Sequence, residues 1–358
     1  MIKFIFSNIF LLSLSVNAVI RTVSNDSNTP AKYDNIQSAM AAATNGDTIY
    51  ILKSPTRYGG NTIVTKALIF IGSGHKSINE QNQNVSDIES FDLRTGCNGS
   101  KFFGLRVNNF FVNDANNIVV SRCMIYDGTI NFQYSGGNVK TNWIIEGCLF
   151  KNGRIALNGS SSKNIIIRNN LFDVNSNSYI NSSNDPTVII TNNLFLGNDY
   201  QISTRRLQDV DKATIANNIF YRTYVYDGNS SSNIFYNNLI MDNSHTVAGN
   251  TFQNTITTLP SFTGYSFIQS MHNQPNSYYW GFYEYILNYY DRSFFLTPGS
   301  VGINAGTDGK DIGLIKGLFN INGTPFIPQI TSFNATPVIN FGSPGDPINF
   351  SVKAKNKK

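Results

Sequence analysis

The sequence predicts an all-β protein built as a parallel β-helix, with coils of about 23 residues. A short phrase, made of a β-branched run, a polar pair and an apolar residue, returns seven times between residues 116 and 252. The second polar residue of the phrase recurs at spacings of 25, 22, 23, 25, 20 and 12. No window shows the 3.6-residue period of a helix, which excludes helical repeats. The seven marker residues are Cys123, Cys148, Asn170, Asn193, Asn218, Asn238 and Asn250.

The markers predict a structural ladder inside the coils. In a parallel β-helix each coil lies about 4.8 Å from the next, so an Asn at one point of every coil stacks on its copies. Its side-chain amide can bond the next amide and also satisfy the backbone at the bend. An apolar residue follows each marker by two positions and would fill the interior. These residues are Ile125, Phe150, Phe172, Phe195, Phe220, Ile240 and Phe252.

The N-terminus carries an export signal. Lys3 is followed by an apolar run that ends in small residues at 16–18, so we expect cleavage after Ala18. No later stretch approaches the ~18 apolar residues that a membrane span needs. We therefore expect residues 1–18 to be a signal peptide, and the remainder to be secreted or held in the cell envelope.

Residues 32–107 are expected to form the N-terminal cap and the first coils. Residues 32–46 form an amphipathic pattern with Ile36, Ala39, Met40 and Ala43 on one face, which predicts a helix that covers the open end of the stack. Residues 47–53, 61–74 and 100–107 have strand composition. The polar stretch 76–98 is interpreted as a protruding loop.

The period is lost after about residue 255. Residues 255–300 are rich in aromatic residues and predict a C-terminal cap, while 316–358 form a tail that packs on or beside the helix. The aromatic residues admit a second interpretation, since rings with polar edges also stack on sugar faces. The candidate carbohydrate-binding residues are Tyr278, Tyr279, Trp280 and Tyr283.

Three stretches carry a resemblance to a known family. These are NIQSAMAAATNGDTIYILKSPTRY (35–58), NTIVTKALIFIGSG (61–74) and FFLTPGSVGINAGTDGKDIG (294–313). Together with the Asn coils they resemble secreted bacterial proteins of the pectin-lyase-like superfamily. The resemblance implies a single-stranded right-handed β-helix over residues 19–315. It does not specify an activity, because the superfamily includes lyases, hydrolases, esterases and adhesins.

The catalytic signatures of related hydrolases are absent from the sequence. There is no Asp-Asp pair, Gly74-His75 lacks a following Gly, and Arg154-Ile155 is followed by Ala. The run at 306–309 lies after the last coil and is interpreted as a terminal turn. The net charge of +5 is scattered, which argues against a nucleic-acid partner, and three His without a Cys/His cluster argue against a zinc centre.

A polysaccharide lyase needs only a base and cations beside a uronate carboxylate. Arg205, Arg206 and Lys212 are the candidate base or anion clamp, in the connection between the Asn193 and Asn218 coils. Asp209 and Asp211 could offer oxygen ligands to Ca²⁺, which would then be a cofactor. The competing interpretation is a solvated loop whose charges pair with one another.

Two cross-coil pairs are also predicted. Glu146 and Arg168 precede their markers by two positions, so they should form a surface ion pair between neighbouring coils. Cys123 and Cys148 are successive markers, within disulfide range of each other. Stacked thiols are favoured over a bridge, because Cys is a common small filler and Cys97 leaves the count odd.

The sequence thus predicts an exported β-helix protein that interacts with a polysaccharide or cell-surface glycan and has no recognisable catalytic motif. One alternative is a Ca²⁺-assisted lyase acting on a uronate-containing glycan. A further alternative is a structural or adhesive surface protein. We expect a monomer without a nucleic-acid partner.

Overall fold

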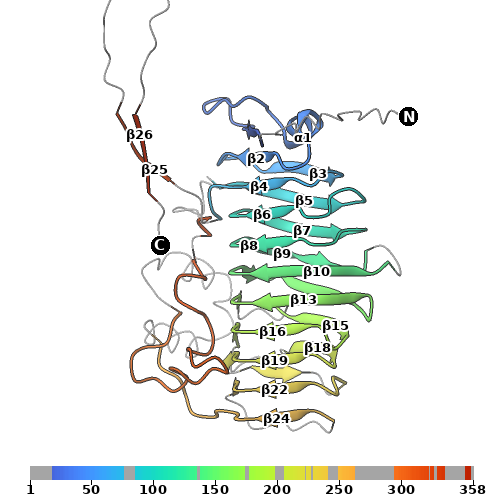
Figure 1. Ribbon diagram of the computed structural model, residues 1–358, viewed down its shortest axis with the longest axis vertical. Coiled ribbons are helices and arrows are strands. Elements are labelled where there is room, and N and C mark those ends of the chain that lie inside the picture. The colour runs from blue at the N-terminus through green and yellow to red at the C-terminus, as the bar shows by residue number, and fades with distance from the viewer. Residues whose placement is uncertain are drawn as a thin grey trace, which may run out of the picture.

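The computed structural model describes residues 18–75, 85–134, 138–173, 177–197, 205–221, 223–226, 229–240, 249–262, 294–321, 323–325, 329–334 and 351–355. It shows a parallel β-solenoid with coils of about 23 residues, stacked from α1 at one end to β24 at the other (Figure 1). One short helix lies among the described residues, and no described helix is long and apolar enough to cross a membrane.

Sheet 1 is an 11-stranded parallel sheet that runs the length of the stack. Each of its strands is bonded to the strand of the next coil in register. Its strands are β1 (Ile20–Val23), β2 (Thr48–Ile51), β4 (Ile69–Ile71), β6 (Lys101–Phe103), β8 (Val119–Ser121), β10 (Lys140–Glu146), β13 (Ser162–Arg168), β16 (Ile189–Thr191), β19 (Thr214–Ala216), β22 (Ile234–Tyr236) and β24 (Thr251–Gln253).

Sheet 2 contains 13 strands and forms the other walls of the coil. One row of longer strands comprises β3 (Tyr58–Val64), β5 (Asp87–Leu93), β7 (Arg106–Val112), β9 (Met124–Asn131), β12 (Arg154–Gly159), β15 (Ile180–Asn184), β18 (Arg205–Asp211) and β21 (Tyr224–Tyr226). A second row comprises β11 (Leu149–Lys151), β14 (Leu171–Phe172), β17 (Leu194–Leu196), β20 (Ile219–Tyr221) and β23 (Leu239–Ile240), and β9 joins the two rows.

The N-terminal cap is confirmed. Helix α1 (Ile36–Ala42) buries Ile36, Ala39 and Met40, and its N-cap Asn35 accepts a hydrogen bond from the Ser38 N–H at 2.8 Å. The Lys66 ammonium donates to the carbonyls of Met40 and Ala43 at 2.9 and 2.6 Å, which satisfies the last turn of the helix.

The buried Asn ladder is confirmed for four of the seven markers. The Oδ1 atom of Asn193 accepts from the backbone N–H and the side-chain amide of Asn170, at 2.9 and 3.0 Å. The Oδ1 atom of Asn218 accepts the same two bonds from Asn193, and that of Asn238 accepts them from Asn218. Each amide except that of the last rung donates to the next amide, so a polar column stays fully bonded inside an apolar core.

The placement of Asn250 in this ladder was wrong. Asn250 bonds Asn233 instead, which donates to its Oδ1 from the backbone at 2.9 Å and from the amide at 3.0 Å. Phe252 correspondingly stacks on Phe235, with ring centroids 4.5 Å apart. The solenoid therefore has a second, shorter Asn ladder at an earlier bend of the coil. The 12-residue spacing arose because Asn238 and Asn250 belong to different bends.

An aromatic column fills the core beside the first ladder. Phe150, Phe172, Phe195 and Phe220 are each fully buried, with successive ring centroids 4.5, 4.6 and 4.7 Å apart. The column continues into Ile125 on one side and Ile240 on the other through strand register. The predicted core column is thus confirmed over these six coils.

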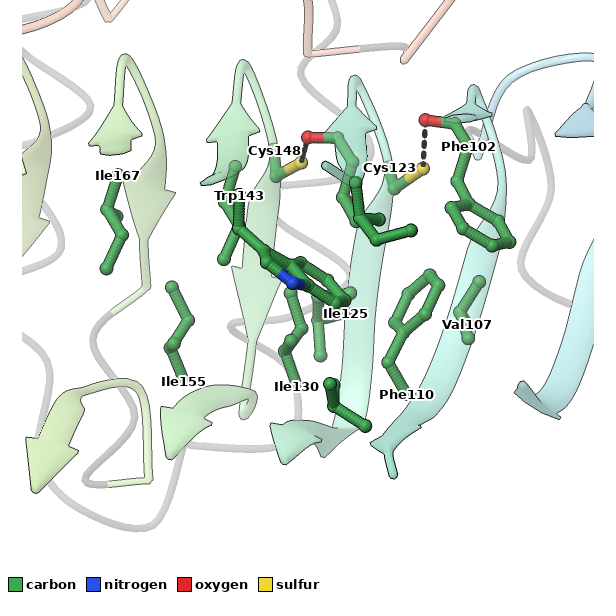
Figure 2. Close-up of a cluster of buried hydrophobic side chains, with 14 of the residues drawn as sticks. Phe102, Val107, Phe110, Cys123, Ile125, Ile130, Trp143, Cys148, Ile155 and Ile167 are labelled. Carbon is green, nitrogen blue, oxygen red and sulfur yellow. Dashed lines mark hydrogen bonds between the residues drawn. The ribbon is translucent and has the colours of Figure 1, made fainter. Parts of the chain in front are cut away.

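Cys123 and Cys148 are free, buried thiols. The Cys123 thiol donates to the Phe102 carbonyl at 3.6 Å, and the Cys148 thiol donates to the Val120 carbonyl at 3.5 Å (Figure 2). One coil further on, the side-chain amide of Asn170 donates to the carbonyl at the equivalent position, that of Ile145. The thiols therefore take the place of amide donors in the ladder, and burial raises the pKa of Cys123 to about 12.

Two predicted loops prove to contain strands. Residues 87–93 of the predicted loop 76–98 form β5, which pairs with β3 and β7. Residues 205–211 form β18, which pairs with β15 and β21. Both were missed because neither DIESFDL nor RRLQDVD alternates strictly between polar and apolar residues, so neither shows the period-2 pattern of a strand.

The chain returns along the outside of the solenoid after the last coil. Residues 294–321 and 323–325, here called the strap, lie beside the stack (Figure 1, orange to red). The strap covers an outward column of Leu149, Leu171 and Leu194 with its own Leu296, Ile312, Leu314 and Phe319. Residues 294–300 thus do not cap the end of the stack, because they pack on its side.

Side chains at successive bends fasten the strap. Asn237 donates to the Ala305 carbonyl at 2.7 Å, Asn217 exchanges two bonds of 3.0 Å with Thr307, and Asn169 accepts from the Ile315 N–H at 2.6 Å. Arg122 donates to the carbonyls of Gly317 and Thr324 at 2.6 and 2.7 Å. The turn at 306–309 therefore lies against the Asn217 coil. Beyond the strap, β25 (Gln329–Asn334) and β26 (Ser351–Lys355) pair antiparallel with each other.

Candidate functional site

The best candidate site is a pocket at the carboxyl ends of β5, β7 and β9. It has a volume of about 300 Å³. Consecutive coils each bring their chain to this edge, so residues about 20 positions apart in the sequence meet there. The lining residues are Arg94, Thr95, Asn113, Asp114, Tyr134 and Asn138, and we call the site the Tyr134 pocket.

A buried carboxylate holds two of the lining residues in place. Asp92, on β5, is 1% exposed and accepts two hydrogen bonds from Arg94, from Nε at 2.9 Å and from an Nη atom at 2.6 Å. Asn113 donates to the other oxygen of Asp92, and Asn61 donates at 3.3 Å. This bonding raises the pKa of Arg94, whose side chain is still 50% exposed. Two polar lining residues are therefore oriented before any ligand arrives.

Two aromatic rings in contact with each other lie beside these polar groups. Tyr134 is 51% exposed, and its ring lies 4.6 Å from the ring of Phe111, centroid to centroid. Phe111 is on β7 and follows Asp92 in register on the next coil. The Phe111 ring supports one part of Tyr134 and leaves an accessible aromatic surface at the pocket.

The lining of the pocket also includes a carboxylate. Asp114 accepts a hydrogen bond from the Thr95 hydroxyl at 2.8 Å. Lys140 on β10 is buried, which lowers the pKa of its ammonium, and the charge of Asp114 acts in the opposite direction. The pocket therefore offers a guanidinium, a carboxylate and amides within a small volume, with the Arg94 charge balanced by Asp92.

The sequence-predicted lyase residues do not come together as a catalytic group. Arg206 is fully buried, donates to the Ser178 and Leu196 carbonyls and bonds Thr223. It therefore holds backbone and cannot reach a substrate, so its assignment as a base was wrong. Arg205 and Lys212 are exposed at opposite ends of β18.

The predicted calcium ligands lie in the same strand. Asp209 is exposed, and one oxygen of Asp211 accepts from the Ser231 N–H and hydroxyl, the latter at 3.0 Å. Within the described ranges, no group of three or more His, Cys, Asp or Glu side chains is placed to hold a metal ion. Asp211 thus has a structural role at the bend.

The other predicted pairs and binding residues have different outcomes. Arg168 donates twice to Glu146, at 2.8 and 2.7 Å, which confirms the cross-coil ion pair. The aromatic candidates Tyr278, Tyr279, Trp280 and Tyr283 lie outside the described residues. The Tyr134 pocket was not predicted, because its coils lack the Asn marker that sets the register elsewhere.

Comparison with known protein families finds no family model that matches this chain. A search of curated proteins finds no related sequence either. Function must therefore be argued from the geometry of the site.

Proposed function

We propose that this protein is an exported carbohydrate-binding β-solenoid that holds a glycan in the Tyr134 pocket. The observation that carries the proposal is the pairing of an exposed aromatic face with preoriented planar polar groups. A sugar ring presents apolar C–H groups on its face and hydroxyl groups at its edge, and the pocket offers a partner for each.

The polar groups suit sugar hydroxyls. Asn113 and Asn138 can both donate and accept, Asp114 accepts, and Arg94 can donate through the guanidinium N–H groups that Asp92 does not take. Because Asp92 already fixes Arg94 and Asn113, little side-chain entropy remains to be lost on binding. A pocket of about 300 Å³ lies at the lower end of small-ligand sites, which suits recognition of one or two sugar units of a chain.

The export signal expected at residues 1–18 fits the same proposal, because an exported protein meets the glycans of the cell envelope and exterior. The contacts among the described lining residues, including that of the Thr95 hydroxyl with Asp114, orient polar groups for hydrogen bonding, and the activity we propose is binding without turnover.

A glycan array probed with the chain from residue 19 onward, followed by calorimetry on the positive glycans, tests the proposal. Tyr134→Ala should weaken binding at least about tenfold, whereas Tyr134→Phe should retain it because the ring remains. Asn113→Ala should weaken it as well. Tyr179→Ala, at a partly exposed tyrosine near Arg154, is the matched control.

Binding that is unchanged in both Tyr134→Ala and Asn113→Ala would remove the pocket from the proposal. Failure to bind any glycan at millimolar concentration would leave a structural or adhesive role as the better account.

A further inference from the structure

The charged groups at the Tyr134 pocket are not equally accessible to a ligand. Two cations, Arg94 and Lys140, balance two carboxylates, Asp92 and Asp114, so the arrangement of the charges matters more than their sum. Arg94 already donates twice to the buried Asp92, at 2.9 and 2.6 Å. Lys140 is fully buried and is not one of the lining residues. Both cations are thus engaged by the protein itself.

Asp114 is the carboxylate that a ligand can reach. It lines the pocket and is only partly buried. The Thr95 hydroxyl donates to its Oδ2 atom at 2.8 Å, which orients the carboxylate. Within the described part of the chain, the Oδ1 atom of Asp114 accepts no hydrogen bond, and neither oxygen forms an ion pair. The pocket therefore presents an oriented anionic acceptor that the protein leaves for another donor.

The surroundings of Asp114 favour positive charge. Burial raises the pKa of the Cys97 thiol to about 12, and the charges of Asp114 and Asp92 act in the same direction. Cys97 belongs to the turn that carries Arg94, since its backbone N–H donates to the Arg94 carbonyl at 3.1 Å. The two carboxylates are thus felt at this turn although a guanidinium lies beside them.

Tyr134 provides a second group that attracts a cation. Its side chain is 51% exposed, and its ring is supported by Phe111 at 4.6 Å between centroids. The face of an aromatic ring attracts an ammonium group that lies within about 6 Å of its centre. A pocket of about 300 Å³ holds Asp114 and Tyr134 around one small ligand. One ammonium group can therefore contact the carboxylate and the ring together.

An anionic sugar fits the same groups poorly. A uronate carboxylate would have to bind Arg94, which Asp92 already holds, and it would be repelled by Asp114. A neutral N-acetyl group offers no charge to Asp114. An amino group differs from both because it places a cation where the protein has left a carboxylate without one.

We propose that the Tyr134 pocket recognises a sugar unit with a free amino group, so that the ligand is a glycan containing unacetylated hexosamine. The ammonium group donates to the Oδ1 atom of Asp114 and lies against the Tyr134 ring, while Asn138 binds sugar hydroxyls. This inference rests on the proposed glycan binding and names the class of sugar that the pocket selects.

Calorimetry with three oligosaccharides of equal length tests the selection. The ligands are oligomers of glucosamine, N-acetylglucosamine and galacturonate, at about pH 5.5, where the amines are protonated. The glucosamine oligomer should bind at least about tenfold more tightly than each of the others. The net charge of +5 repels cations over the whole surface, so non-specific attraction would give the opposite preference.

Asp114→Asn removes the charge and keeps an oxygen that can accept from Thr95. It should reduce the preference for the glucosamine oligomer over the N-acetylated one to less than about threefold, and the N-acetylated oligomer should bind as it does to the unaltered protein. Asp127→Asn is the matched control, because Asp127 is an exposed carboxylate that accepts from the Asn152 amide at 2.6 Å and lies outside the pocket lining. This control should keep the full preference.

A polyamine separates recognition of an amino sugar from recognition of any ammonium group. Spermidine has ammonium groups but no sugar ring, so it should compete at least about tenfold more weakly than the glucosamine oligomer. Equal competition by spermidine would overturn the assignment to an amino sugar.

The outcomes distinguish this inference from the proposal on which it rests. If the N-acetylated or galacturonate oligomer binds as tightly as the glucosamine oligomer, and Tyr134→Ala weakens that binding, the pocket binds glycans but does not select an amine. A preference that survives in Asp114→Asn would also overturn the inference. Absence of binding to all three oligomers and to the glycan array would overturn both.

Discussion

Truncation of one buried rung should destabilise the whole solenoid, and Asn193→Ala is the sharpest case. The side chain of Asn193 donates to the Ile167 carbonyl at 2.9 Å and accepts from the Asn170 backbone N–H at 2.9 Å. It is fully buried and lies within the Asn ladder. The variant therefore removes a partner from two backbone groups that water cannot reach.

The expected cost follows from those two groups. A buried backbone group left without a partner costs about 1 to 3 kcal/mol, so the loss of two partners in Asn193→Ala should lower the free energy of unfolding by about 2 to 6 kcal/mol. Asn193→Cys should cost less, about 1 to 3 kcal/mol, because a thiol can donate to the Ile167 carbonyl as the Cys148 thiol donates to that of Val120.

Urea titration followed by circular dichroism measures the free energy of unfolding. Asn98→Ala is the matched control, because Asn98 also accepts from a backbone N–H of the next coil, that of Asn116 at 2.8 Å, but is exposed. Water can replace that bond, so the control should cost less than about 1 kcal/mol. If the two Ala variants differ by less than about 1 kcal/mol, burial of the ladder is not what makes it stabilising.

Three further predictions concern other buried groups. Burial and the nearby Arg106 charge lower the pKa of His75 from 6.5 to about 3, so the unfolded chain takes up the proton first. Stability should therefore fall as pH drops from 6.5 toward 3, by up to about 1.4 kcal/mol per pH unit, and His75→Leu should flatten that slope in urea titrations at several pH values. Arg206→Ala should cost about 3 to 5 kcal/mol while Arg205→Ala stays within about 0.5 kcal/mol, and equal melting temperatures of the two would contradict the structural role of Arg206. Arg122→Ala should speed amide hydrogen exchange in residues 315–325 at least about tenfold, since it releases two strap carbonyls; unchanged exchange would show that apolar packing alone holds the strap.

The core could be predicted because its rule is periodic. Each coil must present one donor and acceptor at the same bend and one apolar side chain at the same interior point. Those demands repeat at the coil length, so Asn170, Asn193 and Asn218 and the Phe residues two positions later reveal the fold directly. The helix at 36–42 was predictable for the same kind of reason, through its one apolar face.

The errors came where one motif occurs at two bends of a coil. Asn233 and Asn250 form a ladder with the same hydrogen bonds as the main one, and a sequence motif cannot distinguish the two bends. Strand β18 was missed for a related reason. Its Arg206 is buried through bonds to three groups far along the chain, so a charged residue occupies an interior position.

The candidate site was beyond sequence analysis because it depends on register between coils without Asn markers. Arg94, Asn113 and Tyr134 become neighbours only when β5, β7 and β9 are aligned, and bulges shift that alignment between Val107 and Asn109. One signal was available. The strand register aligns Asp92, Phe111 and Asn131 on adjacent coils. A polar residue next to an aromatic one in such a column could have indicated a binding edge.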